Sequence, residues 1–536
     1  MSRSELMARL IRMARLARHA ERTGESSVDV LGAQAPDDAG RRRFTQGVLA
    51  ATTTAAAWSF SAGALAKASG TTWPVRTAPA DVAVVGAGIA GLACASELAR
   101  LGIGAQVFEA SDRVGGRIAS LRGVFPGQVV ERGAEFIGSS HNVMLGYARQ
   151  LGLELEDLGA APGTAFHYFG GRRYTEAQVL EEFRGFTASI RGDLARISHP
   201  NADQFTPADA EFDFLSIDEL LDLRGAGGLL RQVVSSAVQA EFGTSPDQVS
   251  AISLLRFLHA DQRGKQSALD GSSHRFLRVV DGNDSIPSGL AAQLPRPVAF
   301  DHHLVSVRQL ASGRYRLVFE VGGRLLASEH SAVVLALPFT VLRHVELHAS
   351  LQLPEWKRLA VSTADMGGQN RLLVGFQGPY WYERHGLSGT GFSDRAAMPA
   401  TWESNPGRSG AGNAVLAASL APYSAGPGAA QVQAQTFVDA LEAVAPGAAA
   451  AVARDRNGNL LAHVEDWAGN PLSLGAQVFN RPGYFTTNAH HEAKPVGKLL
   501  FAGDHTSSFY EWQGFMEGAA LSGLRAAAEV QALSRA

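Results

Sequence analysis

The clearest alternation of hydrophobic and polar positions begins at residue 81. Residues 81–85 form a short apolar run typical of a buried strand, and a glycine-rich turn follows directly at 86–91. Residues 92–101 then have the pattern of a helix that ends at Gly102. A second apolar strand at 105–108 completes a strand–helix–strand order, which predicts a parallel βαβ unit.

The turn at 86–91 has the spacing of a dinucleotide-binding fingerprint. Gly86 permits the tight turn, Gly88 lets the backbone approach a pyrophosphate, and Gly91 allows the helix to pack closely on the strand. The helix offers unpaired N–H groups and the positive end of its dipole to the phosphates. Glu109 ends the second strand, where it is placed to accept hydrogen bonds from ribose hydroxyls. Because all these features agree, we predict a dinucleotide site rather than a purely structural turn.

Strand and helix patterns alternate at both ends of the chain, whereas the middle is rich in helices. Residues 303–307 alternate as a strand, and residues 332–338 form a buried strand of the same lobe. Helical runs occupy residues 179–190 and 215–223. We therefore predict an α/β fold in which an α+β substrate domain is inserted into a doubly wound Rossmann-type domain. The Rossmann-type domain is assigned residues 78–158, 270–342 and 463–536, and the substrate domain is assigned residues 159–269 and 343–462.

The first 80 residues follow a different pattern. Residues 1–22 place arginines among apolar residues at helical spacing, which predicts a basic amphipathic helix able to lie on an anionic membrane surface. Arg41-Arg42 and then Phe44 precede an uncharged run that ends in Ala64-Leu65-Ala66. This segment resembles a bacterial twin-arginine export signal, so we expect residues 1–66 to be removed and the mature protein to be soluble, either in the periplasm or secreted. An uncleaved transmembrane anchor is the alternative, because about 20 uncharged residues are long enough to span a bilayer.

The overall composition excludes several classes of function. Hydrophobic residues make up 46% of the 536 residues, so intrinsic disorder is excluded as the main state. The net charge of −3 argues against nucleic acid as a partner. Cys94 is the only cysteine, and the histidine pairs at 302–303 and 490–491 have no third ligand at a suitable spacing, so we predict neither disulfides nor a metal site. No Gly-x-Ser-x-Gly elbow follows a strand, so the sequence gives no support for hydrolase chemistry.

Further motifs extend the fingerprint along the chain. Residues 109–117 (EASDRVGGR) follow the second strand, residues 130–137 (VERGAEFI) come next, and residues 501–519 contain FAGDHT and WQGFMEGA. In this order, over residues 80–533, they resemble the FAD-dependent monoamine oxidase family. The resemblance implies that the Rossmann-type domain binds FAD and that the inserted domain binds an amine.

The resemblance also assigns roles along these motifs. Arg113 and Arg117 would bring positive charge near the pyrophosphate, and Asp504 stands where the family usually has Glu to bind the ribityl chain. A helix opening at 514–519 would direct its N-terminal dipole at the flavin ring, and the backbone of Val305 would contact adenine. The predicted cofactor-binding residues are Gly86, Gly88, Ala90, Gly91, Glu109, Ala110, Arg113, Gly116, Arg117, Glu135, Phe136, Val305, Gly503, Asp504, Gly514, Phe515 and Met516.

The substrate side departs from the family pattern. The family often places two aromatic rings in front of the flavin; here one position matches Phe515, and the other falls at Gln477 or Val478. Arg371 stands where relatives place a lysine that holds a water against the flavin. Other candidate walls are Trp467, Tyr510 and Trp512, with ordinary core packing as the alternative for each. The predicted catalytic residues are Arg371, Phe515, Gln477 and Trp467.

The implied reaction is the two-electron oxidation of a C–N bond, with hydride transfer to flavin N5 and hydrolysis of the imine to a carbonyl compound. We expect a primary or secondary amine, because Glu135 stands where relatives that oxidise amino acids usually carry an arginine for the carboxylate. The alternatives are an L-amino-acid oxidase, a carotenoid-type desaturase, and a catalytically silent flavoprotein that binds a partner.

The same comparison of residues suggests how the cofactor is attached and reoxidised. We expect non-covalent FAD, because Cys94 lies in the first helix, on the wrong side of the cofactor. Arginine at 371 is always charged and presents a wide planar fork, so we expect oxygen to be a slow acceptor beside an exported cytochrome or quinone. The other expected partner is the twin-arginine translocase during export; a homodimer is left open.

Overall fold

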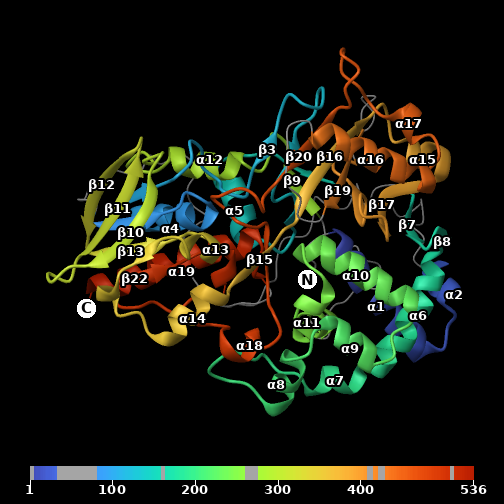
Figure 1. Ribbon diagram of the computed structural model, residues 1–536, viewed down its shortest axis with the longest axis horizontal. Helices are drawn as coiled ribbons and strands as arrows, with labels where there is room; N and C mark the ends of the chain where they lie inside the picture. The colour runs from blue at the N-terminus through green and yellow to red at the C-terminus, as the bar shows by residue number, and fades with distance from the viewer. Residues whose placement is uncertain are drawn as a thin grey trace, which may run out of the picture.

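The computed structural model describes residues 5–32, 81–158, 163–259, 276–406, 414–420, 429–507 and 512–535. These residues form two lobes that lie side by side (Figure 1). We call them the cofactor lobe, built on a four-stranded parallel sheet, and the substrate lobe, built on a seven-stranded sheet. The predicted α/β fold with an inserted α+β domain is confirmed.

The parallel sheet of the cofactor lobe joins the beginning, middle and end of the chain. Its strand order is β2 (Ala105–Phe108), β1 (Val82–Val85), β13 (Ala332–Leu335) and β22 (Leu499–Phe501). All three pairings are parallel, so the carboxyl ends of the strands lie at one edge. The loops after β1, β13 and β22 therefore start at that edge, where ligands bind in open parallel sheets.

The two faces of this sheet are covered differently. Helices α4 (Ile89–Arg100) and α19 (Met516–Arg535) pack on one face, where Val84 lies in their hydrophobic cluster. On the other face Val85 packs with Phe319, which belongs to a second sheet. That sheet has the order β12 (Arg324–His330), β11 (Tyr315–Val321), β10 (His303–Gln309) and β14 (Glu346–Leu347). A sheet therefore takes the place that helices have on the second face of a fully doubly wound fold.

The substrate lobe is centred on a mostly antiparallel sheet. Its order is β20 (Ala462–Glu465), β16 (Asn370–Phe376), β19 (Ala414–Leu420), β18 (Ala400–Glu403), β17 (Leu387–Ser393), β7 (Thr164–Phe169) and β8 (Arg172–Tyr174). Helix α16 (Ala429–Val444) packs on one face of it. A group of helices packs on the other: α6 (Glu176–Ser189), α7 (Arg191–Arg196), α8 (Pro207–Asp213), α9 (Ile217–Leu223), α10 (Gly228–Phe242) and α11 (Ala251–His259).

Short elements connect the lobes and line their boundary. The strands are β3 (Ser120–Leu121), β4 (Val130–Glu131), β5 (Ile137–Gly138), β6 (Leu155–Asp157), β9 (Phe276–Val279), β15 (Asp365–Gly367) and β21 (Gln477–Phe479). The helices are α5 (Asn142–Gln150), α12 (Ser285–Ala292), α13 (Phe339–Leu342), α14 (Glu355–Thr363), α15 (Tyr380–His385), α17 (Ala448–Ala451) and α18 (Tyr484–Thr487), with 3-10 turns at Pro246–Gln248, Ala349–Leu351 and Asp504–Thr506.

Two of the predicted domain boundaries differ from the packing. Leu353 and Val361 belong to the hydrophobic cluster of the parallel sheet, so the cofactor lobe continues beyond the predicted boundary at 342. The boundary at 463 falls inside β20, which pairs with β16 of the substrate lobe. No turn signal in the sequence marks either boundary. Only the tertiary packing of these residues shows to which lobe they belong.

The amphipathic helix near the N-terminus packs on protein. It is α1 (Glu5–Thr23), followed by α2 (Ser27–Gly32), and its apolar face lies in the core of the substrate lobe. The interpretation of residues 1–22 as a helix lying on a membrane surface is therefore wrong. The twin-arginine segment at 41–66 lies outside the described residues, so the export signal stays a prediction. Within the part of the chain that the structure describes, no helix combines the length and apolarity needed to cross a bilayer.

Candidate functional site

A cavity of about 370 Å³ lies where the two lobes meet. Its walls come from the loops after β1, β2, β13 and β22 of the cofactor lobe and from strands β16, β18 and β19 of the substrate lobe. Residues of both lobes are therefore needed to enclose any molecule that the cavity binds.

The fingerprint glycines shape one end of this cavity. Gly86 has a φ of +103°, and a Cβ there would lie 2.6 Å from the carbonyl oxygen of Ala336. A Cβ at Gly91 would lie 1.9 Å from the carbonyl oxygen of Gly86, so only glycine allows α4 to pack this closely. Gly88 precedes α4 without a side-chain cap, and no atom lies within 4 Å of the position where its Cβ would be. The first N–H groups of α4 thus border open space, as a bound pyrophosphate requires.

Glu109 is fixed at the edge of the same space. Its Oε2 accepts the N–H of Ala87 at 2.7 Å, and its Oε1 accepts the N–H and the hydroxyl of Ser111. The side chain ties the turn after β1 to the loop after β2 and lines the cavity. This is the position from which an acid can reach a ribose.

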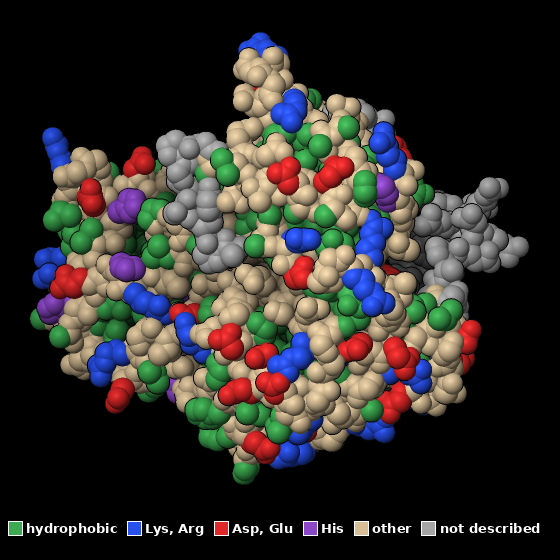
Figure 2. All heavy atoms as spheres, turned by 45° about the vertical axis from the view of Figure 1, so that its right-hand side comes forward, with side chains coloured by type: hydrophobic (Ala, Val, Ile, Leu, Met, Phe, Trp, Pro, Cys, Tyr) green, Lys and Arg blue, Asp and Glu red, His purple; other side chains and the backbone are tan. Residues whose placement is uncertain are grey.

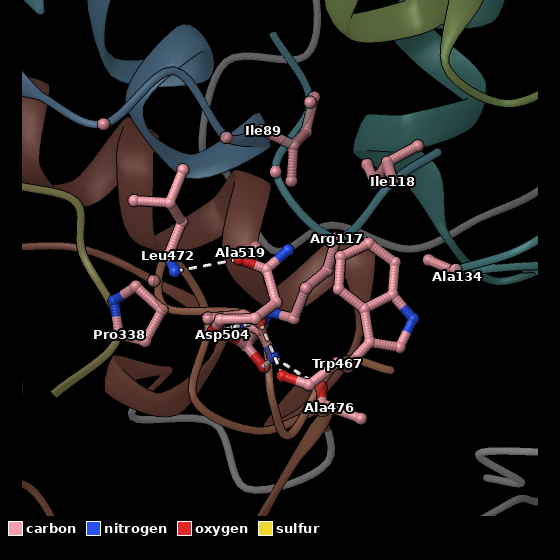
Figure 3. A pocket seen from close by; sticks show the side chains of 18 of the residues that line it. Ile89, Arg117, Ile118, Ala134, Pro338, Trp467, Leu472, Ala476, Asp504 and Ala519 are labelled. Carbon is pink, nitrogen blue, oxygen red and sulfur yellow. Dashed lines mark hydrogen bonds and ion pairs between the residues drawn. The ribbon is translucent and has the colours of Figure 1, made fainter. Parts of the chain in front are cut away.

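Arg117 and the buried Asp504 form an ion pair in the wall of the cavity (Figure 3). The guanidinium Nη2 lies 2.5 Å from Asp504 Oδ1, Nη1 lies 3.2 Å from Oδ2, and Nη1 also donates to the carbonyl of Ala476 at 2.7 Å. Burial acts to raise the pKa of Asp504, but Arg117 and the neighbouring His505 more than offset it, so the pKa lies well below its ordinary value. The sequence motif predicts Arg117 beside the pyrophosphate but gives no sign of its pairing with Asp504.

Arg113 has a different role from Arg117. Its Nη2 donates to the carbonyl of Gly116 at 2.6 Å, and its Nη1 donates to Val114 at 3.3 Å. Burial lowers the pKa of this guanidinium. The arginine thus holds its own loop in shape, so that Gly116 lies against Gly88 at the phosphate end of the cavity.

Helix α19 begins beside the predicted substrate residues. Gly514 has a φ of +84°, and a Cβ there would lie 2.2 Å from Gln477 Nε2, so the amide of Gln477 lies directly over this turn. The ring of Phe515 stands edge-on to His141, with 5.6 Å between the centroids. Trp467 donates its indole N–H to the carbonyl of Arg132 at 3.1 Å, and its ring lies beside Arg117 (Figure 3).

Arg371, Glu135 and Trp402 form a second buried group of polar contacts. Arg371 Nη1 lies 3.1 Å from Glu135 Oε2 and donates to the carbonyl of Glu131 at 2.9 Å. The indole of Trp402 donates to the same Glu135 oxygen at 2.9 Å, and the Arg371 guanidinium lies 5.2 Å from the centre of the Trp402 ring. Burial raises the pKa of Glu135, and Arg371 opposes this effect. Glu135 Oε1 has no hydrogen-bond partner among the described residues.

Most of the predicted site residues line the cavity. Those that do are Gly86, Gly88, Ala90, Glu109, Ala110, Arg113, Gly116, Arg117, Glu135, Phe136, Arg371, Trp467, Gln477, Gly503, Asp504, Gly514, Phe515 and Met516. Gly91 acts behind the wall, and the exposed Val305 is not part of the lining, which His302, His303 and Leu304 supply instead. Tyr510 lies outside the described residues.

Several residues of the substrate lobe that were not predicted from the sequence also line the cavity. Trp402, Ser419 and Asn370 belong to three neighbouring strands, β18, β19 and β16. Ser419 stands directly opposite Arg371 in the antiparallel register, which places both on one face of the sheet. No short motif marks these positions; only the strand pairing brings them together. No group of three or more potential metal ligands occurs among the described residues.

Comparisons with known proteins agree with this architecture. The family model described as flavin containing amine oxidoreductase matches residues 89–531. The Mycobacterium tuberculosis (strain ATCC 25618 / H37Rv) protein named "Putative flavin-containing monoamine oxidase AofH" is 29% identical over 477 residues, covering 84% of this chain and 97% of that protein. The flavin-containing amine oxidase B of Homo sapiens is 24% identical, covering 84% of this chain and 86% of that protein.

Solved structures show the same fold. Cyclohexylamine oxidase from Brevibacterium oxydans IH-35A superposes with a TM-score of 0.71 at 22% identity, covering 85% of this chain and 100% of that chain. Wild-type putrescine oxidase bound to putrescine gives a TM-score of 0.69 at 21% identity, covering 84% and 99%. The chain belongs to the flavin-containing amine oxidoreductase family, and it is an enzyme that uses a flavin to oxidise amines.

Proposed function

We propose that the enzyme binds FAD non-covalently and oxidises a primary or secondary amine that lacks an α-carboxylate. The observation that carries the substrate class is the Glu135–Arg371 pair in the cavity wall. Its arginine is already matched by a carboxylate, so the carboxylate of an amino acid would meet Glu135 as a like charge. The cyclohexylamine and putrescine named in the similar structures are also amines without a carboxylate.

The residues of the cavity fit FAD. Gly88 and the N-terminus of α4 would hold the pyrophosphate, Glu109 the adenosine ribose, and Asp504 the ribityl chain. When bound, FAD would accept a hydride, which carries both electrons of the oxidation, from the carbon next to the amine nitrogen. The first turn of α19 lines the cavity, so its dipole would favour negative charge on a ring system bound there.

The protein's own residues bind and orient the amine. Phe515 and Trp467 give the cavity apolar walls, and the amide of Gln477 gives it a donor and an acceptor. Arg371 is held by Glu135, Trp402 and the carbonyl of Glu131, so it forms a fixed part of the wall. Enclosure between the lobes excludes water from the reacting carbon.

Matched pairs of substrates test this proposal. Under anaerobic conditions, the flavin absorbance of the purified enzyme should be bleached faster by tryptamine than by L-tryptophan, and faster by phenethylamine than by L-phenylalanine. Faster bleaching by the amino acids would overturn the substrate class, and the absence of bleaching by a broad set of amines would overturn the activity. Reduction by dithionite provides the control that the flavin is competent.

Cofactor attachment gives a separate prediction. Cys94 is fully buried in α4 and does not line the cavity, and burial raises the pKa of its thiol, so it is neither exposed to a cofactor bound there nor reactive. Precipitation with acid should therefore release all of the flavin into the supernatant, as measured by its absorbance. Yellow colour that remains in the washed pellet would contradict non-covalent attachment.

We also propose that oxygen reoxidises this enzyme slowly, with an exported cytochrome or quinone as the working acceptor. Arg371 remains charged and is engaged by three groups of the protein, which supports a fixed role rather than the positioning of a mobile water. After reduction by substrate, mixing with air-saturated buffer should restore the flavin absorbance more slowly than the enzyme turns over with an artificial dye. Arg371→Lys should speed that step, and equally fast reoxidation of the unchanged enzyme would refute the proposal.

Export by the twin-arginine route is proposed from residues 41–66 alone. Replacing Arg41-Arg42 by two lysines should keep the enzyme in the cytoplasmic fraction of a bacterial host, because the translocase requires both arginines. Equal amounts of periplasmic enzyme with either sequence would contradict this route.

A further inference from the structure

Helices α1 and α2 form part of the wall of the substrate lobe, although they precede a segment that resembles a removable export signal. In Figure 1 they lie among α6, α9 and α10, which are distant from them in the sequence. Helix α1 packs against α6, α10, α11 and strand β18, and α2 packs against α6. These contacts make the N-terminal segment continuous with the folded lobe.

The apolar face of α1 is buried as deeply as a core helix. The buried residues, all at most 8% exposed, are Met7, Leu10, Ile11, Met13, Ala14, Leu16, Ala17 and Ala20. They share one hydrophobic cluster with Phe183 of α6, Val234 of α10 and Leu258 of α11. Removal of α1 would expose the partners of all these side chains to water at once, and a stable lobe does not leave so large an apolar surface uncovered.

The polar side of α1 and α2 is also matched to the lobe. Arg18 donates to the carbonyl of Leu258 at 2.8 Å, and the hydroxyl of Ser27 donates to Glu181 of α6 at 2.6 Å. Glu21 pairs with Arg191 of α7. On the face that Figure 2 brings forward, basic and acidic side chains are interspersed, so no continuous basic surface is offered to anionic lipid.

The elements beneath α1 carry part of the cavity. Near its C-terminal end, α10 carries Ala240 and Glu241, which line the cavity, and β18 carries Trp402, the partner of Glu135. Since α1 packs directly on both elements, it supports the substrate wall from behind. The cofactor lobe has its own hydrophobic clusters, to which α1 contributes no residue.

We propose that residues 5–32 are a permanent part of the folded enzyme. They stay bound to the substrate lobe even where the chain is cleaved near Ala66, and they hold α10 and β18 in position at the cavity. A twin-arginine route would be compatible with this, because the helices can dock before transport. The proposal does not depend on which amine is the substrate.

Controlled cleavage of the full-length holoenzyme tests the proposal. A site-specific protease sequence inserted after Ala66 allows the chain to be cut after folding. The fragment should then co-elute with the body in gel filtration, with both masses found by mass spectrometry, and the thermal unfolding midpoint should not change. Ala17→Arg, at a fully buried position of α1, should release the fragment after cleavage, whereas Val28→Arg, at an exposed position of α2, should not. Leu10→Ala is the milder variant if Ala17→Arg fails to fold.

Release of the fragment should affect substrate binding by the substrate lobe and leave flavin binding by the cofactor lobe unchanged. The KM for the amine should rise by about tenfold or more, because displaced wall residues bind the substrate poorly, while the flavin stays bound and absorbs normally. A synthetic peptide of residues 5–32 should reverse the change. The proposal is overturned if the cleaved, unaltered enzyme loses its fragment and keeps its unfolding midpoint and KM, or if enzyme purified from exporting cells is active without residues 5–32.

Discussion

Asp504→Ala is expected to give a folded protein that purifies with little or no FAD. The substitution leaves the partly buried Arg117 with the carbonyl of Ala476 as its remaining partner in the group. Removing one member of a buried ion pair typically costs about 3–5 kcal/mol. If most of this cost falls on the cavity, FAD affinity should drop by a factor on the order of 10² to 10³. The ratio of flavin to protein absorbance and a titration of apoenzyme with FAD measure the loss.

Further variants separate the contributions of the two charges of this pair to FAD binding. Arg117→Ala should lose FAD to a similar extent, and the double variant should lose less than the sum of the two, because the partners act as a unit. Asp81→Ala is the matched control, since Asp81 pairs with Arg314 at the surface and such pairs contribute little. Full retention of FAD by Asp504→Ala would show that the pair does not shape the cofactor site.

The pH response of the same pair has a definite sign. The pKa of Asp504 is depressed in the folded protein, so its contribution is fully present above the ordinary pKa of an aspartate and is lost only as the pH falls through the lowered value. FAD retention by the unchanged enzyme should therefore be constant from about pH 5 to pH 8 as far as this group is concerned. Loss of FAD on moderate acidification, absent in Asp504→Asn, would contradict the assignment.

Local steric requirements explain what could be predicted from the sequence. Gly86, Gly88 and Gly91 are separated by a few residues; Gly86 and Gly91 are required by close approaches of backbone to backbone that only glycine allows, and Gly88 leaves open space before α4. Their spacing with the flanking strands is therefore visible in any stretch of about 30 residues. Strand β2 has the predicted bounds, and α4 begins at Ile89, three residues before the predicted start of the helix, so that Gly91 lies in its first turn.

Contacts between distant segments could not be predicted in this way. Arg117 and Asp504 are 387 residues apart, and Trp402 and Glu135 are 267 apart, so no local pattern links either pair. Glu135 is assigned to the cofactor because it lies within the motif at 130–137, but its side chain contacts Trp402 and Arg371 of the substrate lobe. The apolar face of α1 likewise gives the same sequence pattern whether it covers lipid or protein.

Arg371→Leu is expected to destabilise the protein through Glu135. The substitution removes the main charge that opposes the desolvation of this carboxylate, so that the hydrogen bond from the Trp402 indole and the charge of Arg278 remain to favour its ionised form. The expected cost is about 3–5 kcal/mol of unfolding free energy if Glu135 remains ionised, and less where it takes up a proton. Chemical unfolding with urea, followed by tryptophan fluorescence, measures the change.

Glu135→Gln in the same background provides the decisive comparison. An uncharged amide needs no cation, so the double variant Arg371→Leu/Glu135→Gln should recover most of the lost stability, whereas Arg316→Leu, which removes a surface pair with Glu329, should change little.

The pKa of Glu135 is already raised by burial, and loss of Arg371 raises it further. A carboxyl with a raised pKa binds its proton more tightly in the folded state, so the stability of Arg371→Leu should fall as the pH rises from the ordinary glutamate value towards the raised one. Equal destabilisation with Glu and with Gln at position 135, at every pH, would show that Arg371 acts through other contacts.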